Sequence, residues 1–232
     1  MDLINNRKAD LEIYKNLDFY EEPKEYFKDC VEIIKSIKKS PENFIDLGCA
    51  NGSFLNYLSN EFSASKLYGI EPEKDLFKIS KKFSNAKIYN KKLEEFKTEK
   101  RFEVITAMGL IGIFFDPVIF IKKINSLLSE NGIAIILSPF NEENIDVILN
   151  HRNSLTSEWE SGNNVFSQQT LNQICSSHDL SYEWKNFEIS FPIKKTKDPM
   201  RNWTEKFRDK EFFFISGLNM FYTIKFLIIS KT

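Results

Sequence analysis

One short segment determines most of what the sequence implies about architecture, namely Phe44-Ile-Asp-Leu-Gly-Cys-Ala-Asn-Gly-Ser-Phe54. Its pattern is typical of a buried strand that runs into a tight glycine turn and then into a helix. Such a turn presents backbone N–H groups to a ligand at the carboxyl end of the strand. Gly48 and Gly52 would also suit a turn without a ligand, but Glu71 follows at the end of the next strand candidate. An acid about 20 residues beyond the glycines suits the two hydroxyls of a ribose.

The glycine spacing distinguishes between two kinds of nucleotide ligand. A dinucleotide site requires the pattern GxGxxG, in which the second glycine lets a diphosphate approach the backbone. The corresponding positions are Gly48, Ala50 and Ser53, so two of the three glycines are missing. Asp46 precedes the turn, where its carboxylate would repel a diphosphate and attract an ammonium group. The pattern therefore favours a cationic adenosine ligand without phosphates.

Strand and helix patterns alternate on both sides of this segment. Short runs rich in Ile, Val and Phe predict strands over 44–47, 66–70, 86–89, 102–107 and 133–137. Apolar residues at helical spacing predict helices over 53–61, 73–83 and 117–128. The last of these is expected to end in a C-cap at Asn131-Gly132. This alternation predicts an α/β fold with a parallel sheet covered on both faces.

The flanking regions follow a different pattern. Residues 22–39 predict an amphipathic helix with Tyr26 and Ile37 among its apolar residues, whereas residues 141–162 are polar and irregular. Ser167 is a suitable N-cap, and further strands are expected over 182–191 and 222–230. The apolar stretch 212–229 is interrupted by polar residues, so it predicts two strands around a turn rather than a membrane helix.

Charge and composition exclude several classes of partner. The 232 residues include 32 Lys and Arg and 33 Asp and Glu, so the formal net charge is -1. Arginine occurs only at positions 7, 101, 152, 201 and 208, which argues against nucleic-acid recognition. Cys30, Cys49 and Cys175 are widely spaced, so neither a disulfide framework nor a metal site is expected. The N-terminus lacks the apolar segment of a signal peptide, and a cytoplasmic location is expected.

Taken in order, these motifs resemble the class I S-adenosylmethionine-dependent methyltransferases of small-molecule type. The resemblance is carried by Asp46-Leu-Gly-Cys-Ala-Asn-Gly52, Gly69-Ile-Glu-Pro72, Phe102-Glu-Val-Ile-Thr-Ala-Met108, the helix that follows Phe115-Asp-Pro117, and the strand that ends in Leu137-Ser-Pro-Phe140. It continues more weakly through Val165-Phe-Ser-Gln-Gln-Thr-Leu171 and Phe226-Leu-Ile-Ile-Ser-Lys231.

The resemblance implies a Rossmann-like, seven-stranded, mostly parallel sheet with an antiparallel last strand, helices on both faces and an N-terminal helical cap. A single domain is expected over residues 1–232. It would consist of the cap (1–42), a cofactor-binding core (43–140) and a C-terminal part that binds the acceptor (141–232).

The resemblance also assigns roles around S-adenosylmethionine. The methionyl part would be held by Asp46 and the glycine loop, Gly48, Cys49, Ala50, Asn51 and Gly52. Glu71 would bind the ribose hydroxyls, Pro72 and Leu93 would flank the adenine, and Ala107 and Met108 would line the methyl-transfer cavity. Lys91-Lys-Leu-Glu-Glu95 departs from the acidic adenine loop of many members, so Glu94 or backbone groups would contact the adenine amine.

The acceptor end departs further from the family pattern. Gly112-Ile113 replaces the Glu-His pair found after the fourth strand in many members, and Gly162-Asn-Asn-Val165 lacks another customary histidine. His151 is therefore the candidate general base, while His178, at a helix end, is assigned a structural role. The acceptor candidates are aromatic residues and one arginine from both ends of the chain: Tyr14, Tyr20, Trp159, Arg201 and Trp203.

These features predict a small-molecule O-methyltransferase with a sugar-like or glycan-like acceptor. Two alternatives remain, namely a methyltransferase for a quinone, lipid precursor or other small molecule, and a non-catalytic homologue that binds the cofactor. A nucleic-acid or protein methyltransferase would require a basic face or an Asn-Pro-Pro-Tyr type of motif, and the sequence has neither.

Overall fold

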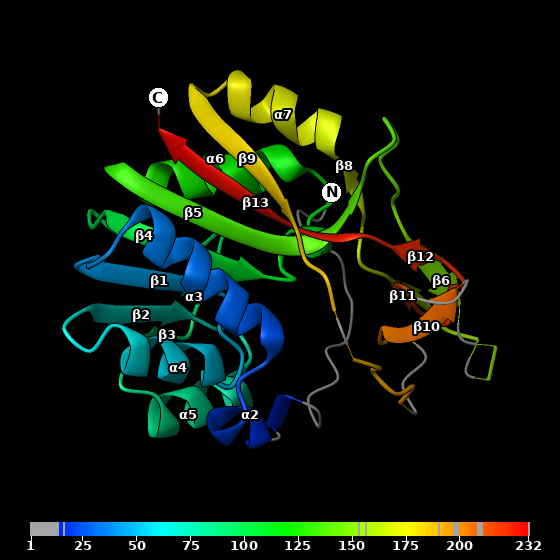
Figure 1. The fold of residues 1–232 in the computed structure, drawn as a ribbon, viewed down its shortest axis with the longest axis horizontal. Helices are drawn as coiled ribbons and strands as arrows, with labels where there is room; N and C mark the ends of the chain where they lie inside the picture. Colours follow the sequence, from blue (N-terminus) through cyan, green and yellow to red (C-terminus); the bar gives the residue numbers. More distant parts are fainter. Residues whose placement is uncertain are drawn as a thin grey trace.

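A computed structural model describes residues 14–15, 17–152, 154–155, 157–189, 191–196, 200–207 and 211–231. Its centre is a mostly parallel sheet with the strand order β3-β2-β1-β4-β5-β13-β9 (Figure 1). The strands are β1 Asn43–Leu47, β2 Lys66–Ile70, β3 Lys87–Tyr89, β4 Phe102–Met108, β5 Leu128–Asn141, β9 Leu180–Asn186 and β13 Ile224–Lys231. The last strand is antiparallel to both neighbours, as expected. A short additional strand, β8 Phe166–Ser167, pairs with the end of β5.

The strand order places a topological switch point between β1 and β4. Strand β1 pairs in parallel with β2 on one side and with β4 on the other. The direction in which the chain builds the sheet therefore changes at β1, and ligands of open α/β sheets bind at such a point. Asp46 of β1 lies opposite Gly69 of β2 and Thr106 of β4. Residues at the ends of three strands are thus brought to one place.

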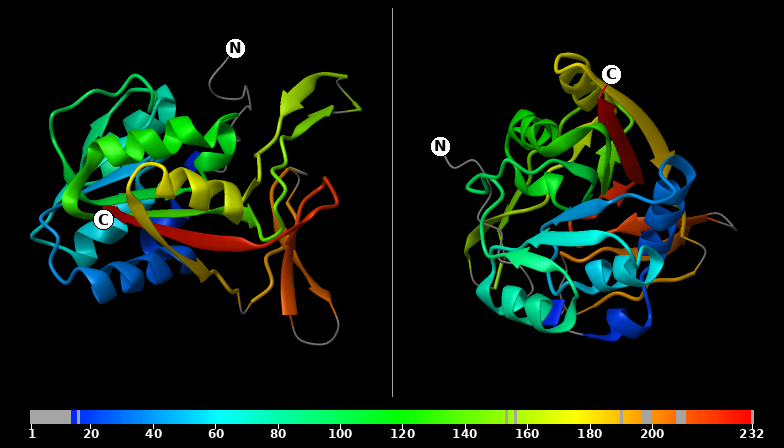
Figure 2. Two further views of the ribbon diagram at one scale, coloured as in Figure 1. Left: turned by 90° about the horizontal axis from the view of Figure 1, so that it is seen from above. Right: turned by 90° about the vertical axis from the view of Figure 1, so that its left-hand side faces the viewer.

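Helices cover both faces of the sheet (Figure 2). One apolar cluster packs α3 Glu25–Ile37 and α4 Ser53–Glu61 against the sheet, and it includes Phe27, Ile34 and Phe54. The other packs α6 Pro117–Leu127 and α7 Gln168–Ser176 against the opposite face, and it includes Phe120 and Leu171. Helix α5 Lys74–Phe83 lies beside α4 and β3, and the short α2 Asp18–Glu21 lies beside α4.

Helix boundaries mostly agree with the sequence patterns. Helix α4 has the predicted bounds, and the Ser167 hydroxyl accepts a hydrogen bond from the Thr170 N–H at 3.1 Å to cap α7. Helix α3 is shorter than the predicted 22–39. Ile37, predicted on its apolar side, is 45% exposed because it ends the helix beyond the packed turns. The predicted cap begins at residue 1, but residues 1–13 lie outside the described part of the chain.

The predicted C-cap at Asn131-Gly132 is wrong. Helix α6 ends at Leu127, and β5 begins at Leu128, so both residues lie within the strand. The glycine has a different purpose, because a Cβ at Gly132 would lie 2.7 Å from the carbonyl oxygen of Phe102. The register of β4 with β5 also shifts at this point. Gly132 therefore permits a close approach of two backbones rather than a left-handed helix end.

The C-terminal third contains two small sheets beyond the end of β5 (Figure 1). One pairs β6 Asn150–Arg152 with β7 Trp159–Ser161, within a region predicted to be irregular. The other contains β10 Trp203–Phe207, β11 Glu211–Ile215 and β12 Phe221–Tyr222. The antiparallel pairing of β11 with β12 confirms the predicted reversal within the stretch 212–229. Among the described residues, no helix combines the length and apolar character needed to cross a membrane.

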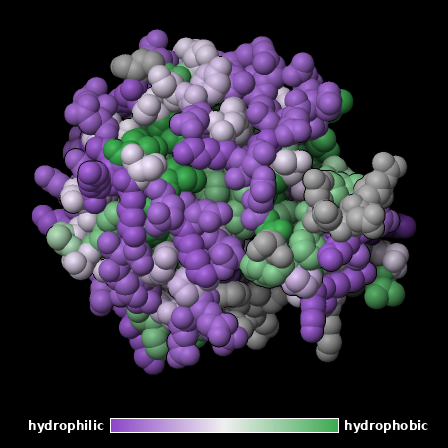
Figure 3. Space-filling model, viewed as in Figure 1, coloured by the Kyte–Doolittle hydropathy of each residue, from purple (hydrophilic) through white to green (hydrophobic). Residues whose placement is uncertain are grey.

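Hydrophilic residues cover most of the face that carries α3, α4 and α5 (Figure 3). Helix α5 illustrates the reason, because only Leu76 and Ser80 of this helix are buried, while four of its ten residues are lysines. The polar sides of these helices face water and their apolar sides face the sheet. This arrangement leaves the strand ends, rather than the helix faces, as the place to look for a ligand site.

Candidate functional site

The loop between β1 and α4 has a backbone conformation that requires glycine. Gly48 and Gly52 have φ angles of +72° and +86°. A Cβ at Gly52 would also lie 2.9 Å from the Cβ of Ser80. The N–H groups of Gly48 and Cys49 donate to the carbonyl oxygen of Ile70 at 2.9 and 3.0 Å, which ties the loop to the end of β2. The turn at the carboxyl end of β1 is therefore held in one shape.

Glu71 connects this loop to the segment after β2. One carboxylate oxygen accepts a hydrogen bond from the Ala50 N–H at 2.9 Å, and the other accepts one from the Glu73 N–H at 2.8 Å. The side chain is buried, with 6% exposure. Each carboxylate oxygen retains a further lone pair. Glu71 thus fixes the loop and still has acceptors for two hydroxyl groups.

Asp46 is the second buried acid at the strand ends. Its Oδ1 accepts a hydrogen bond from the Thr106 hydroxyl of β4 at 2.7 Å. Burial raises the pKa of Asp46 to about 7, against the smaller lowering effect of this hydrogen bond, and Glu71 raises it further. Burial likewise raises the pKa of Glu71 to about 7, although the N–H groups of Glu73 and Ala50 lower it. Two acids in one desolvated site favour a cationic ligand, which would stabilise their charged forms.

A side chain of the loop after β3 joins that loop to the segment after β2. The Asn90 amide donates to the carbonyl oxygens of Glu71 and Pro72 at 2.8 and 2.9 Å. Leu93 is buried and, with Glu94, lines a surface depression of about 410 Å³. The other lining residues of this depression are Phe114, Ile119, Lys122, Lys123 and Ser126. Of the predicted adenine contacts, Leu93 and Glu94 thus line this depression, whereas Pro72 does not.

The end of β4 carries the two residues predicted to line the transfer cavity. Ala107 is fully buried, whereas Met108 is half-buried and packs against the cluster beneath α3 and α4. The next residue, Gly109, has a φ of +76°, and a Cβ there would meet no atom within 4 Å. The position of a Cβ on Gly109 is therefore open. The two buried acids and the glycine loop suit a cationic nucleoside such as S-adenosylmethionine.

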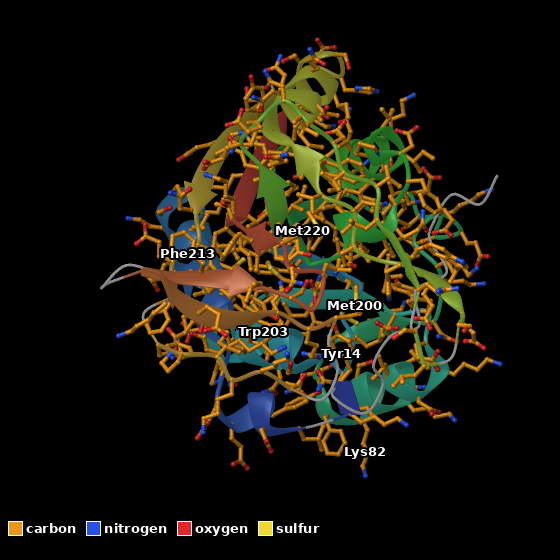
Figure 4. All side chains as sticks on the ribbon, turned by 90° about the vertical axis from the view of Figure 1, so that its right-hand side faces the viewer. Tyr14, Lys82, Met200, Trp203, Phe213 and Met220 are labelled. Carbon is orange, nitrogen blue, oxygen red and sulfur yellow. The ribbon has the colours of Figure 1, made fainter. Side chains whose placement is uncertain are left out.

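The structure brings two of the predicted acceptor residues together. The Arg201 guanidinium carbon lies 5.3 Å from the centre of the Tyr14 ring, although the two residues come from opposite ends of the chain. Figure 4 shows Tyr14 on the same side of the molecule as Met200 and Trp203. The hydroxyl of Tyr20, the other tyrosine of the predicted set, donates to the Asn51 carbonyl oxygen at 2.5 Å. Tyr20 therefore contacts the glycine loop directly.

The two tryptophans of the predicted acceptor set differ in exposure. Trp203 begins β10, is buried, and donates from its indole nitrogen to Glu205 at 2.9 Å. The Lys195 ammonium lies 4.6 Å from the centre of the Trp203 ring. Trp159 begins β7 and is 68% exposed. These contacts involve neither the glycine loop nor the two acids, and the role proposed for the tryptophans stays a prediction.

The two histidines occupy different environments. His151 lies on β6 opposite Glu160, and its buried Nδ1 has no hydrogen-bond partner among the described residues. His178 follows α7, and its Nδ1 lies 2.8 Å from the carbonyl oxygen of Ile174. That contact supports the structural role assigned to His178. His151 retains a ring nitrogen able to accept a proton, and its catalytic role stays a prediction.

The two segments that depart from the family pattern, around Gly112 and Asn164, contact each other. The Asn164 N–H donates to the Gly112 carbonyl oxygen at 2.7 Å, and the Asn164 amide donates to that of Phe114 at 2.8 Å. A Cβ at Gly112 would lie 2.8 Å from the Asn164 carbonyl oxygen. Backbone therefore occupies the space beside Gly112. A nearby cavity of about 20 Å³, lined by Asn163, Met200, Asn202 and Tyr222 among others, has room for a water molecule but not for an acceptor.

Sequence reasoning missed three residues that shape the site. Thr106 places a hydroxyl group inside a buried, mostly apolar strand. A polar residue in such a strand indicates a hydrogen-bond partner, which is Asp46. Tyr26 was assigned to the apolar side of its helix, yet its hydroxyl interacts electrostatically with Asp46, Tyr14 and Arg201. Lys24 precedes α3 and interacts electrostatically with Arg201. No local pattern indicates the last two, because their partners are distant in sequence.

Comparison with solved structures supports the fold. The chain is similar to Streptomyces venezuelae DesVI, with a TM-score of 0.60 and 11% identity over 97% of this chain and 100% of that one. It is also similar to the plantazolicin methyltransferase BpumL, solved with a triazolic desmethylPZN analog and SAH, with a TM-score of 0.58 and 11% identity over 93% and 89% of the two chains.

A third similar structure is the O-methyltransferase of a trans-AT PKS multienzyme of Brevibacillus brevis, solved with S-adenosyl-L-homocysteine. Its TM-score is 0.56, with 14% identity over 80% of this chain and 66% of that one. Comparison with curated proteins gives no match.

The fold is that of a class I, S-adenosylmethionine-dependent methyltransferase. A family model described as a methyltransferase domain matches residues 21–187. The chain therefore belongs to this methyltransferase-domain family, and the family resemblance seen in the sequence is confirmed.

Proposed function

We propose that this methyltransferase transfers a methyl group to a hydroxyl of a small, sugar-like acceptor. The observation that carries the enzymatic part is the arrangement of Asp46, Glu71 and the glycine loop at the switch point of the sheet. The O-methyltransferase of Brevibacillus brevis, which shares the fold, supports the choice of reaction. The contact of Tyr14 with Arg201 supports a polar, ring-shaped acceptor bound by residues from both ends of the chain.

The donor is held by residues of the core in this proposal. Glu71 accepts hydrogen bonds from the ribose hydroxyls, and Asp46 and the loop Gly48, Cys49, Ala50, Asn51 and Gly52 hold the methionyl part. Pro72 and Leu93 enclose the adenine, and Ala107 and Met108 line the transfer cavity. S-adenosylmethionine supplies an electrophilic methyl group on a sulfonium. Because the hydrogen bonds of Glu71 hold the loop in one shape, less entropy is lost when the donor and acceptor are aligned. Alignment of two reactants can lower a reaction barrier by about 7–11 kcal/mol in favourable systems.

In this proposal, residues outside the donor-binding core bind the acceptor. Tyr14, Tyr20, Trp159, Arg201 and Trp203 form the proposed recognition set. A hydroxyl acceptor has to lose its proton, and we assign that proton to Nδ1 of His151, since this nitrogen has no other partner among the described residues. The division into a cap over 1–42, a donor-binding core over 43–140 and an acceptor-binding part over 141–232 belongs to the same proposal, as does a cytoplasmic location.

Calorimetric titration with S-adenosylmethionine tests the donor site. The wild-type protein should bind, and Glu71→Gln should weaken binding about 10-fold or more, because hydrogen bonds to a charged group contribute about 1.5–3 kcal/mol. Glu130→Gln is a matched control, since Glu130 is an exposed acid that pairs with Lys231 at 2.7 Å. Lack of wild-type binding at millimolar ligand, or unchanged binding in Glu71→Gln, would contradict the donor site.

Incubation with S-adenosylmethionine and a panel of hydroxylated sugars, phenols and quinols tests the acceptor class. Mass spectrometry should detect a sugar that has gained one methyl group, together with S-adenosylhomocysteine. Methylation restricted to phenols or quinols would replace the sugar-like acceptor by the quinone class. Donor binding without product from any acceptor would favour the non-catalytic alternative.

A further inference from the structure

The glycine loop, residues 48–52, is held by two segments that lie outside it. The segment after β2 holds its middle, because the Ala50 N–H donates to the Glu71 carboxylate at 2.9 Å. The N-terminal segment holds the next residue, because the Asn51 carbonyl oxygen accepts a hydrogen bond at 2.5 Å from the hydroxyl of Tyr20. Tyr20 lies on α2, so a residue from before the first strand contacts the backbone of the proposed donor site.

The side chain of Tyr20 is packed between the loop and α5. Its ring lies edge-on to that of Phe83, the last residue of α5, with 5.9 Å between the ring centres. A Cβ on Gly52 would lie 3.2 Å from the Tyr20 hydroxyl oxygen and 2.9 Å from the Cβ of Ser80. Tyr20 and α5 thus confine the loop at Gly52, where the backbone has a φ of +86°.

The hydroxyl of Tyr20 is the donor in its contact with Asn51. A carbonyl oxygen can only accept, so the phenol proton lies toward it. Burial raises the pKa of Tyr20, and the neighbouring Cys49 raises it further, so the phenol stays protonated near neutral pH. Asn51 is buried, with 4% exposure. Water therefore has little access to replace this hydrogen bond.

The segment that carries Tyr20 also contacts other parts of the molecule. The Lys15 ammonium lies 3.8 Å from the Asp75 carboxylate of α5. The Tyr14 ring lies 5.3 Å from the guanidinium carbon of Arg201, which belongs to the part of the chain assigned to the acceptor. Contacts on more than one side therefore support the position of Tyr20 against the glycine loop.

We infer that Tyr20 is a positioning residue, which holds the glycine loop in the conformation that binds the methionyl part of the donor. The inference rests on the proposed function, in which this loop and Asp46 hold that part. It is additional to the place of Tyr20 in the acceptor set. Coupling between two interactions is reciprocal, so a hydrogen bond that favours donor binding is itself favoured by a bound donor. Donor binding should therefore stabilise α2 as well as the loop.

Hydrogen exchange, measured by mass spectrometry, tests whether Tyr20 holds the loop. Tyr20→Phe removes the hydroxyl and keeps the ring that packs on Phe83. In the ligand-free variant, the N–H groups of residues 48–53 should exchange about 3-fold faster or more. In the wild type, saturating S-adenosylhomocysteine should slow the exchange of α2, and in Tyr20→Phe it should slow it less.

Tyr182→Phe is the matched control for both experiments. Tyr182 is 40% exposed and lies on β9, which β4, β5 and β13 separate from β1 in the sheet. Loss of this hydroxyl should leave the exchange of the loop and the affinity for nucleosides as in the wild type.

Calorimetric titration with two nucleosides tests whether the loop acts on the methionyl part. S-adenosylhomocysteine carries the amino and carboxyl groups of that part, whereas methylthioadenosine lacks both. Tyr20→Phe should weaken the binding of S-adenosylhomocysteine about 3- to 10-fold and change that of methylthioadenosine less than about 2-fold. A general loss of structure would weaken both ligands alike, so the difference between them is specific to a positioning role. The exchange experiment decides alone if methylthioadenosine binds too weakly to titrate.

Four outcomes would overturn the positioning role. The loop of ligand-free Tyr20→Phe could exchange as in the wild type, or S-adenosylhomocysteine could protect α2 equally in both proteins. Tyr20→Phe could also retain the wild-type affinity for S-adenosylhomocysteine, or lose affinity for both nucleosides alike, which would assign Tyr20 to the general stability of the fold. Failure of the wild-type protein to bind S-adenosylhomocysteine would instead contradict the proposed function itself.

Discussion

Asp46 illustrates how a ligand site is maintained at the expense of stability. The carboxyl group is buried at the end of β1 with the Thr106 hydroxyl as its hydrogen-bond donor, and its pKa is raised to about 7. In an unfolded chain the pKa of an aspartate is about 3.9. At a pH between these two pKa values, the Asp46 carboxyl group is therefore protonated in the folded, ligand-free protein and ionised in the unfolded chain. The contribution of Asp46 to stability falls as pH rises from about 4 to about 7.

Asp46→Asn should make the ligand-free protein more stable at pH 8, by on the order of 2–4 kcal/mol, and weaken donor binding. Asn can still accept the Thr106 hydrogen bond, so packing should change little. Urea unfolding at pH 5, 6.5 and 8 measures the difference, which should be smallest at pH 5. Asp75→Asn is the control, since Asp75 is half exposed on α5. A pH-independent difference between wild type and Asp46→Asn would contradict the proposed cost of the buried charge.

The site residues differ in how far the sequence could indicate them. Asp46 and Glu71 stand at the ends of predicted strands, so the parallel topology alone places them together. Tyr26 lies on the apolar side of its helix, and packing alone would explain an aromatic residue at that position. No local pattern indicates that Tyr14 and Arg201 meet, because their contact joins segments at opposite ends of the chain. Local patterns thus predict the donor end and not the contacts between the two ends of the chain.

At the scale of elements, the sequence predicts the strands around the switch point better than the connections between them. Strand β2 and helix α4 have the predicted bounds because their apolar periodicity agrees with their turn residues. Asn131-Gly132 carries a strong local turn signal, yet pairing with β4 extends β5 back to Leu128. The β6–β7 pair was missed because its strands have three residues each and little apolar content.

Gly132→Ala tests the close approach of β4 and β5. The added Cβ would lie 2.7 Å from the Phe102 carbonyl oxygen, a backbone atom that cannot move alone. Denaturant unfolding should show a loss of about 1–3 kcal/mol. A helix C-cap would require a left-handed backbone at this residue, but Gly132 is not among the glycines with positive φ.

Gly109→Ala provides the comparison for that prediction. Its φ of +76° makes any side chain strained, but the added Cβ meets no atom within 4 Å. The cost there should be about 1–2 kcal/mol, from backbone strain alone. A neutral effect of Gly132→Ala would show that the two strands can separate at no cost, against the structure.

At the scale of the molecule, the C-terminal third has two roles. It supplies β9 and β13 to the main sheet and also the smaller sheets beyond β5. Lys225 of β13 connects these parts, because its buried ammonium donates to Asn186 at 2.6 Å and pairs with Glu142 at 2.5 Å. Asn186 ends β9, and Glu142 directly follows β5. Three segments that lead toward the proposed acceptor region thus meet at one side chain.

Lys225→Met should destabilise the protein by about 1–3 kcal/mol, because it leaves the Asn186 side chain and Glu142 without their donor. Lys231→Met is a matched control on the same strand, since its partner Glu130 is 86% exposed, and it should cost less than about 1 kcal/mol. Thermal unfolding of both variants measures the contrast. Equal destabilisation by the two substitutions would show that the buried contacts of Lys225 contribute no more than a surface pair.

The position of β13 also constrains the order in which the chain can fold. This strand lies between β5 and β9, so β9 joins the sheet only through a segment made about forty residues after it. During synthesis, β1 to β5 can assemble while β9 still has no partner in the main sheet. The methyl-donor half of the protein can therefore take shape on the ribosome well before the half that we expect to recognise the acceptor.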